Sequence, residues 1–450
     1  MSLSVEAAPA HRRLGSWFLI AFPHLGALLI LLATETSLVG RFAFVLAWAF
    51  FTLGWMAVLR RPAVAGMLAL GFLVLLVLLS RFKHEILLMT VNFVDVMLID
   101  ADTIAFLLQV FPRLDLKAAA GAIVVAAALA MVWRLDRARV RRSLAAGGAA
   151  ASLGGLVCLS VLVPNDPWEE FYAENYFSKY ARSAVTAISD LITRGVLDSD
   201  KTATERLAAS PSTPCRLDKP PHIIMVHDES SFDARAIPGL KVPKGYGDHF
   251  VSGDGKRRTL LVEGPGGPSW YTEYSILTGL SARSFGRFVD FTTRIAVGRI
   301  ERGLPRALAR CGYKTFTLYP MYGTFLSARA FQTTAGIQSF IDAQSLGAKF
   351  QDADSFYFDA AAATLAKHRA EGPLFVLVYT AQNHFPWTFR FRPDLAPDWT
   401  APGNRADVDE YLRRQHLTAV DYQAFLARLK REFPGEPFLI VRFGDHQPYF

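Results

Sequence analysis

The chain is poor in cysteine, lacks a basic stripe and contains no internal repeat or low-complexity tract. Its net charge of +8 is not arranged as Lys and Arg interleaved with aromatic residues, which is the pattern typical of nucleic-acid binding. We therefore expect no nucleic-acid partner. The chain has only three cysteines.

The cysteines lie in two different environments. Cys158 lies inside an apolar stretch and should be inert. Cys215 and Cys311 both lie in the C-terminal half, where they can pair if that half is outside the cytoplasm. A disulfide and two unrelated thiols are both open alternatives, because a bridge needs Cα atoms about 4.4–6.8 Å apart.

Long apolar runs fill the first third of the chain. Hydrophobic residues make up 52% of the sequence, which is high for a purely soluble protein. Five stretches approach the roughly 20 residues that cross a bilayer. They are residues 17–34, 42–59, 63–79, 118–133 and 144–163. These stretches predict a polytopic α-helical membrane domain over residues 1–164.

The distribution of Lys and Arg around these stretches predicts their orientation. One side carries Arg12, Arg13, Arg60, Arg61, Arg134, Arg137, Arg139, Arg141 and Arg142. The other side carries fewer, namely Arg41, Arg81, Lys83, Arg113 and Lys117. The richer side includes the N-terminus and should be cytoplasmic. With five spans, everything after Pro164 then lies outside the cytoplasm.

Residues 86–110 are also apolar, but they include Asp95, Asp100 and Asp102. An acidic side chain at the centre of a bilayer is costly, so we interpret this segment as interfacial or re-entrant. If it crossed the membrane instead, the C-terminal half would be cytoplasmic.

The rest of the sequence predicts a linker and an α/β domain. Residues 165–218 form the linker, with a helix at 172–192 that either lies along the membrane surface or is an ordinary amphipathic helix. In residues 219–450, apolar runs alternate with helical patterns, which favours a mostly parallel sheet covered by helices. The predicted strands are 222–226, 314–319, 374–379 and 438–443. The predicted helices are 270–280, 303–311, 358–371 and 408–433.

Two polar strings directly follow predicted strands. Glu229 comes after the first strand, and Asp445 and His446 come after the last. Ligands bind at the carboxyl ends of strands in such sheets, so these three side chains can converge on one metal ion. Asp228 is a weaker candidate ligand. Taken alone, Glu229 is better explained as part of a helix N-cap with Asp228 or Ser230.

Ser269 follows a Gly/Pro-rich turn and should open a helix. The N–H groups and dipole at a helix N-terminus favour an anionic phosphate, and a metal ion would make the hydroxyl a nucleophile. The alternative is that Ser269 only caps the helix. Thr272 is a rival nucleophile, and Glu273 either orients the site or is solvated.

Two further residues could bind a substrate. His384 follows the third predicted strand and could hold a phosphate or protonate a leaving group; the alternative is a hydrogen-bonded loop histidine. Arg329 could clamp a phosphate oxygen, although a surface arginine is the more common case.

These strings, HIIMVHDESS, GGPSWYTEYSILTGL, NHFPW and Gly444-Asp445-His446, resemble the membrane-anchored branch of the alkaline phosphatase/sulfatase superfamily. The chain is most similar to the lipoteichoic acid synthase-like phosphoglycerol transferases, with the phosphoethanolamine transferases as close relatives. The resemblance covers nearly the whole chain. It implies five membrane spans in a bacterial inner membrane and a sulfatase-like α/β domain on the periplasmic side.

The resemblance implies a role for each matching residue. Ser269 matches the nucleophile and His384 the substrate-binding histidine, whereas Arg329 lies one position from the family's arginine. The implied metal ligands are Glu229, Ser269, Asp445 and His446. The metal itself is open among Mn²⁺, Zn²⁺ and Mg²⁺.

The sequence departs from the family in two ways. The family nucleophile is usually Thr, and family members usually continue beyond the position of Phe450, so a truncated sequence is an open alternative. A true sulfatase is disfavoured, because no C/S-x-P-x-R string surrounds Ser269. Residues 212–216 fit those letters, but they lie in the linker and are interpreted as a chance match.

The resemblance implies metal-dependent transfer of a phospho-headgroup, with phosphoglycerol favoured. The donor is a membrane phospholipid, the acceptor a glycan or lipid hydroxyl, and the intermediate a covalent adduct on Ser269. The alternatives are a phosphoethanolamine transferase, a phosphodiesterase that uses water, and a lipid or glycan receptor without catalysis.

Overall fold

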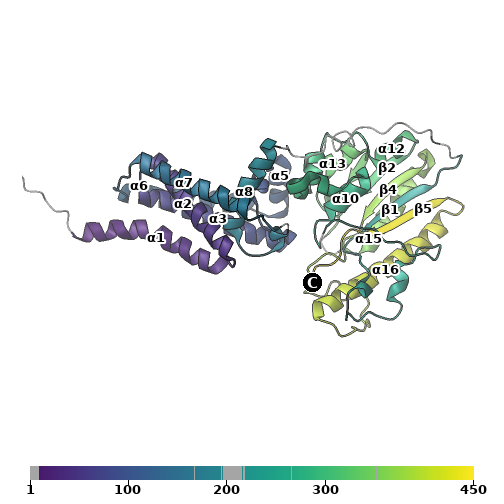
Figure 1. Cartoon of the computed structure of the whole chain (residues 1–450). Coiled ribbons are helices and arrows are strands. Elements are labelled where there is room, and N and C mark those ends of the chain that lie inside the picture. The colour runs from purple at the N-terminus through teal and green to yellow at the C-terminus, as the bar shows by residue number, and fades with distance from the viewer. Residues whose placement is uncertain are drawn as a thin grey trace, which may run out of the picture. The chain divides into compact units, whose positions relative to one another are not determined.

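The computed structural model describes residues 10–166, 168–193, 195, 215, 218–264, 266–349 and 352–450. The described residues form two compact units (Figure 1). The first comprises those within 1–100 and 107–195, and the second comprises 101–106 and those within 196–450.

Five helices of the first unit are long and apolar enough to cross a membrane. They are α1 (Ala10–Thr34), α2 (Leu38–Leu59), α3 (Pro62–Leu87), α6 (Leu114–Leu135) and α7 (Arg142–Leu162). The 22 residues of α2 extend about 33 Å, which matches the ~30 Å hydrocarbon core of a bilayer. The prediction of five apolar helices is confirmed.

Residues 86–110 contain two short helices, α4 (Phe93–Met97) and α5 (Ala101–Val110). A helix of 10 residues extends only about 15 Å, so neither is long enough to cross. Asp95 pairs with Lys83 at 2.7 Å and closes a capping box with Asn92. The acidic side chain is therefore satisfied by local partners.

The predicted linker helix is α8 (Tyr176–Thr193). It packs against α2, α3, α4 and α7, and its residues Phe177 and Tyr180 share a hydrophobic core with Phe44 and Leu73. This helix belongs to the core of the first unit. Most of the remaining predicted linker, from 196 to 217, lies outside the described residues, so the linker boundaries stay a prediction.

The second unit contains a five-stranded, fully parallel sheet in the order β3-β2-β4-β1-β5. The strands are β1 (His222–Asp228), β2 (Lys314–Leu318), β3 (Ser339–Ile341), β4 (Leu374–Tyr379) and β5 (Phe438–Gly444). Its helices are α10 (Ser269–Thr278), α11 (Thr292–Ala296), α12 (Leu304–Arg310), α13 (Ala328–Ala335), α14 (Ala343–Leu346), α15 (Asp354–His368) and α16 (Ala406–Glu432). The predicted α/β fold class is confirmed.

Side chains alternate between the two faces of the sheet, and helices pack against these faces to form the layers of this unit. In β1, Ile224 and Val226 point into a core with Val376 of β4 and with α15 and α16, because successive side chains of a strand face opposite sides. Helices α12 and α13 contact β2 and β3 (Figure 1). His227 alternates with Val226 and therefore faces away from α15 and α16.

The sequence did not predict β3 or the helices α11, α13 and α14. β3 has only three residues, and a run that short has no detectable period. It occupies an edge of the sheet, so its omission leaves the central strands that position the site unchanged.

Candidate functional site

Three metal-ligand side chains converge at the carboxyl ends of β1 and β5. The strands are adjacent and parallel, with Asp228 opposite Gly444, so both chains leave the sheet at the same edge. One ligand atom from each of Glu229, Asp445 and His446 lies within 4.8 Å of the others, and all three residues are buried. His446 Nε2 lies 3.6 Å from Glu229 Oε1 and 3.4 Å from Asp445 Oδ2. We call these three residues the ligand trio.

The chemistry of the ligand trio fits a divalent cation. Oδ2 of Asp445 is buried and accepts no hydrogen bond of ordinary length and angle from the residues that the structure describes. His446 Nδ1 lies 3.0 Å from the carbonyl oxygen of Gln447. Because a carbonyl only accepts, Nδ1 carries the proton and the lone pair of Nε2 is free for a metal. Two carboxylates and one imidazole suit Zn²⁺, Mn²⁺ or Mg²⁺.

The electrostatics of the trio point the same way. Burial raises the pKa of Asp445 and the Glu229 carboxylate raises it further, although His446, His227 and the Ser269 hydroxyl lower it. Burial lowers the pKa of His446, but the two carboxylates outweigh that effect and raise it above its usual value. The site therefore carries negative charge that a bound cation would neutralise.

Ser230 connects the two sides of the trio. Its hydroxyl donates to Glu229 Oε1 over 2.7 Å, and its backbone N–H donates to Asp445 Oδ1 over 2.8 Å. Its φ of 50° is left-handed, a conformation that non-glycine residues adopt only at a cost. The Tyr411 hydroxyl donates to the Ser230 carbonyl over 2.8 Å and helps to hold this turn.

Ser269 is the first residue of α10, as the Gly/Pro-rich turn predicts. Its hydroxyl lies beside the Asp445 carboxylate, so the structure brings it to the ligand trio. The preceding turn needs glycine at Gly266, where φ is 64° and an added Cβ would lie 2.8 Å from Cβ of Tyr449. Ser269 thus stands at a helix N-terminus, where N–H groups attract an anion.

Thr272 and Glu273 point into protein contacts. The Thr272 hydroxyl donates to the backbone carbonyl of Asp445 over 2.6 Å, which leaves Ser269 as the better nucleophile. Gln332 Nε2 donates to Glu273 Oε1 over 2.8 Å. Burial raises the pKa of Glu273 to about 7, although hydrogen bonds with Gln332 and Tyr379 lower it. Both side chains tie α10 to neighbouring parts of the domain.

Asp228 is directed away from the ligand trio. Its Oδ2 accepts from Arg442 Nε over 2.7 Å, and its Oδ1 accepts from the Thr380 hydroxyl over 3.2 Å. Thr380 Oγ1 also accepts the backbone N–H of Glu229 over 3.0 Å. Asp228 therefore anchors the end of β1 through a buried ion pair.

His384 lies exposed on the loop after β4. Its Nδ1 donates to the carbonyl of Phe385 over 2.6 Å, and no hydrogen bond or ion pair described for its ring reaches the ligand trio. Arg414 on α16 is buried and donates to the carbonyls of His384, Pro386 and Phe389 over 2.8–3.1 Å. Arg414 thereby fixes the course of the His384 loop.

Arg329 is held by structural contacts. Its Nη2 donates to Asp342 Oδ2 over 2.5 Å, and its Nη1 donates to the carbonyl of Phe340 over 2.9 Å. The structure therefore ties Arg329 to the end of β3 and does not join it to the ligand trio.

His227 is a buried neighbour of the site that the sequence did not single out. Its ring stacks on Tyr379 with centroids 4.4 Å apart, and its Nδ1 lies 4.0 Å from Asp445 Oδ2. Burial lowers its pKa, although Asp445 raises it. His227 precedes Glu229 by two residues, and alternate side chains of an extended chain share a face. This spacing is the signal by which the sequence could have placed His227 beside the ligand trio.

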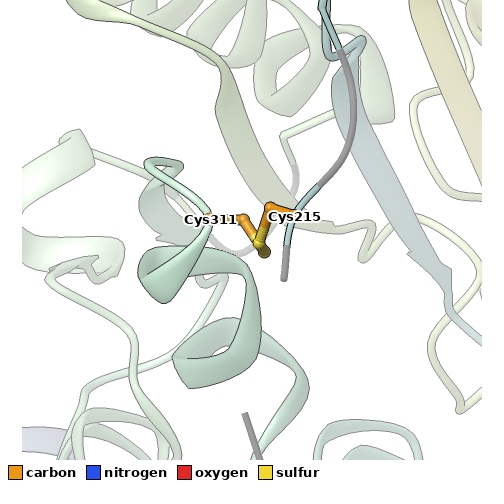
Figure 2. Close-up of a disulfide and its surroundings, with 2 residues drawn as sticks. All are labelled: Cys215 and Cys311. Atoms are coloured by element: carbon orange, nitrogen blue, oxygen red, sulfur yellow. A yellow bond between two sulfur atoms is a disulfide. The ribbon is translucent and has the colours of Figure 1, made fainter. Parts of the chain in front are cut away.

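Cys215 and Cys311 form a disulfide with Cα atoms 5.5 Å apart (Figure 2). Cys311 follows the last residue of α12. The bridge ties the chain ahead of β1 to the helix that precedes β2, across 96 positions of sequence. Cys158 is a free, exposed cysteine.

Comparison with known proteins identifies the part of the chain that carries this site. A family model described as Sulfatase matches residues 269–450. We call the second unit, which contains these residues, the sulfatase-family domain. The match begins at Ser269 and includes Asp445 and His446, whereas Glu229 precedes it and directly follows β1 of the same sheet. No curated protein matches the chain.

Several solved structures resemble the sulfatase-family domain or the whole chain. The lipoteichoic acid synthase LtaP from Listeria monocytogenes is 17% identical, with a TM-score of 0.42, and the match covers 55% of this chain and 62% of that one. The phosphoethanolamine transferase EptA from Neisseria meningitidis is 13% identical, with a TM-score of 0.45, and the match covers 92% of this chain and 83% of that one. The chain thus spans less than two thirds of LtaP. The family assignment rests on the family model.

Proposed function

We propose that this protein is a membrane-anchored, metal-dependent phosphotransferase. It moves a phospho-headgroup, phosphoglycerol in preference to phosphoethanolamine, from a membrane phospholipid to a glycan or lipid hydroxyl. One observation carries the proposal: Ser269 opens a helix beside the buried trio of Glu229, Asp445 and His446. A nucleophile, an anion-binding helix end and a set of metal ligands therefore lie together.

The chemistry follows from the placement of Ser269. Its oxygen attacks the phosphorus of the lipid phosphodiester, an O–P bond to Ser269 forms, and the bond to the diacylglycerol oxygen breaks. Diacylglycerol leaves with a proton in exchange for the one that Ser269 loses. The acceptor hydroxyl then attacks the same phosphorus, and Ser269 regains its proton as the O–P bond breaks.

The surrounding residues stabilise the charge that develops on phosphorus. The backbone N–H groups at the start of α10 face an anion at Ser269. A divalent cation held by Glu229, Ser269, Asp445 and His446 would neutralise phosphoryl charge and lower the pKa of the serine hydroxyl. His384 binds the headgroup from the loop that Arg414 holds.

The same proposal places the sulfatase-family domain on the periplasmic side of a bacterial inner membrane. The excess of Lys and Arg on one side of the five apolar helices supports a cytoplasmic N-terminus. The Cys215–Cys311 disulfide supports an oxidising compartment for the C-terminal half. A donor in the bilayer fits a catalyst tethered to it, because tethering raises the effective concentration.

The proposal is tested by diacylglycerol release from vesicles of phosphatidylglycerol or phosphatidylethanolamine by the purified full chain with Mn²⁺. We expect release chiefly from phosphatidylglycerol, with loss of release in Ser269→Ala and after chelation. Ser275→Ala is the matched control, because that hydroxyl donates only to the carbonyl of Tyr271 on the same helix. Undiminished release by Ser269→Ala would refute the proposal. No release from either lipid by metal-loaded protein would favour a receptor.

A further inference from the structure

An exposed segment rich in cationic and apolar side chains precedes the turn that carries Ser269. Every residue from 251 to 261 is exposed, and the chain runs on from there to Gly264 and α10. Lys256, Arg257 and Arg258 are followed closely by Leu260 and Leu261, whose exposed fractions are 46% and 90%. We call residues 256–261 the basic-apolar tip.

The arginines of the tip are paired at the surface of the domain. Arg258 donates to both carboxylate oxygens of Asp254, over 2.6 and 3.0 Å, and to the Ser252 hydroxyl. Arg257 lies 3.9 Å from Asp233 and donates to the carbonyl of Gly247 over 3.3 Å. All four charged side chains are at least one-third exposed, and ion pairs at exposed positions contribute little and yield to other partners. Within residues 251–261, three cationic side chains accompany a single carboxylate, so the segment carries a positive surplus.

We propose that the basic-apolar tip docks on an anionic phospholipid surface. Leu260 and Leu261 enter the headgroup region, while the three cations contact lipid phosphates. This docking is independent of which reaction Ser269 performs. If Ser269 does act on a lipid, the docked tip holds the nucleophile turn beside the surface that supplies the donor.

Two observations favour a lipid bilayer as the surface on which the basic-apolar tip docks. The chain carries five apolar helices long enough to cross a membrane, and the proposed anchoring by these helices keeps the chain at a lipid surface. An anionic glycan would also attract Lys256, Arg257 and Arg258, but it would leave Leu261 in water. Only a surface with both phosphates and apolar chains satisfies the whole tip.

The test uses the full chain in nanodiscs, with a fluorophore at position 261. Cys158→Ser removes the free thiol, the Cys215–Cys311 disulfide stays oxidised, and Leu261→Cys is labelled with an environment-sensitive dye. The matched control is a label at Val420→Cys, a position on α16 with a 52% exposed side chain. The readouts are the emission shift and quenching by spin-labelled lipids in phosphatidylcholine discs with and without phosphatidylglycerol.

We expect a blue shift and lipid quenching at position 261 in anionic discs, and neither at position 420. Arg257→Gln and Arg258→Gln should each lower the ratio of docked to undocked tip about fivefold. Salt should act in the same direction, because the screening length falls from about 10 Å at 0.1 M to about 3 Å at 1 M.

Two results would overturn the docking. The first is a label at position 261 that is unquenched in anionic discs, or quenched no more than the label at position 420. The second is a label that ignores lipid composition but shifts when dextran sulfate is added, which would assign the tip to anionic glycans.

Discussion

The backbone N–H of Ser230 donates to Oδ1 of Asp445 over 2.8 Å, although 215 positions of sequence separate the two residues. The hydroxyl of the same serine donates to Glu229. One residue thus fixes carboxylates that follow two different strands, and it does so with a φ of 50°. A left-handed serine costs on the order of 1 kcal/mol, and its persistence here indicates that the surrounding contacts enforce the turn.

Ser230→Ala removes the hydroxyl and keeps the backbone hydrogen bond to Asp445. We expect the affinity for Mn²⁺ or Zn²⁺ to fall about 10-fold, because Glu229 loses the partner that orients it. Titration calorimetry on the chelator-treated protein measures the change. Ser275→Ala should bind metal as the unmodified protein does, and an unchanged affinity in Ser230→Ala would mean that the Glu229 contact is dispensable.

Removal of metal should destabilise the sulfatase-family domain. Without a cation, Glu229 and Asp445 remain buried close together. A cation at 100 times its dissociation constant stabilises the folded state by about 2.7 kcal/mol. Scanning calorimetry should show a lower Tm after EDTA and recovery with Mn²⁺. Asp445→Asn should lose this response, and a Tm indifferent to metal in the unmodified protein would contradict the metal site.

Gly444→Ala should disrupt the junction between β1 and β5. An added Cβ would lie 1.8 Å from the carbonyl oxygen of Ser231, so the loop after β1 and the end of β5 must move apart just ahead of Asp445. We expect a loss of more than about 2 kcal/mol in the free energy of unfolding, with loss of metal binding. Gly253→Ala is the matched control, because an added Cβ there meets no atom within 4 Å. Equal stability of the two variants in urea would count against this packing.

The stability of the sulfatase-family domain should depend on pH through Asp354. Burial and, to a smaller extent, Asp228 raise its pKa to about 7, against the opposing effect of the backbone N–H groups of Gln382 and Ala381 and the Thr418 hydroxyl. Unfolded Asp titrates near pH ~3.9. Its stabilising contribution is therefore fully present below about pH 4 and is lost as the pH rises through about 7. Asp354→Asn should flatten urea-unfolding stability over this range, and a slope equal to that of the unmodified protein would be the contrary result.

Much of the fold could be predicted because its signals are periodic. Five apolar runs of bilayer length and four apolar strands separated by helical patterns determine the two units and the parallel sheet. The short β3 carries no such period. The packing of α8 in the core of the first unit could not be predicted either. Residues such as Phe177 and Tyr180 indicate an amphipathic helix, but they do not indicate which helices cover its apolar face.

The approach of Glu229 to Asp445 and His446 could be predicted from one rule. Parallel neighbouring strands end at the same edge, so residues after β1 and β5 meet there. The roles of Ser230 and His227 could not be predicted. The role of Ser230 depends on a backbone angle, and that of His227 depends on stacking with a residue of β4. The contacts of Arg329 with Asp342 and Phe340 are likewise visible only in three dimensions.

The most direct test of the central claim is the mass of the protein after incubation with its donor. The metal-loaded full chain is mixed with phosphatidylglycerol or phosphatidylethanolamine, without acceptor, and is analysed by intact mass and peptide mapping beside Ser269→Ala. We predict a phosphoglycerol adduct on the peptide that contains Ser269, and no adduct in the variant. An adduct on another residue, or turnover of lipid with no adduct at any time, would contradict a covalent intermediate on Ser269.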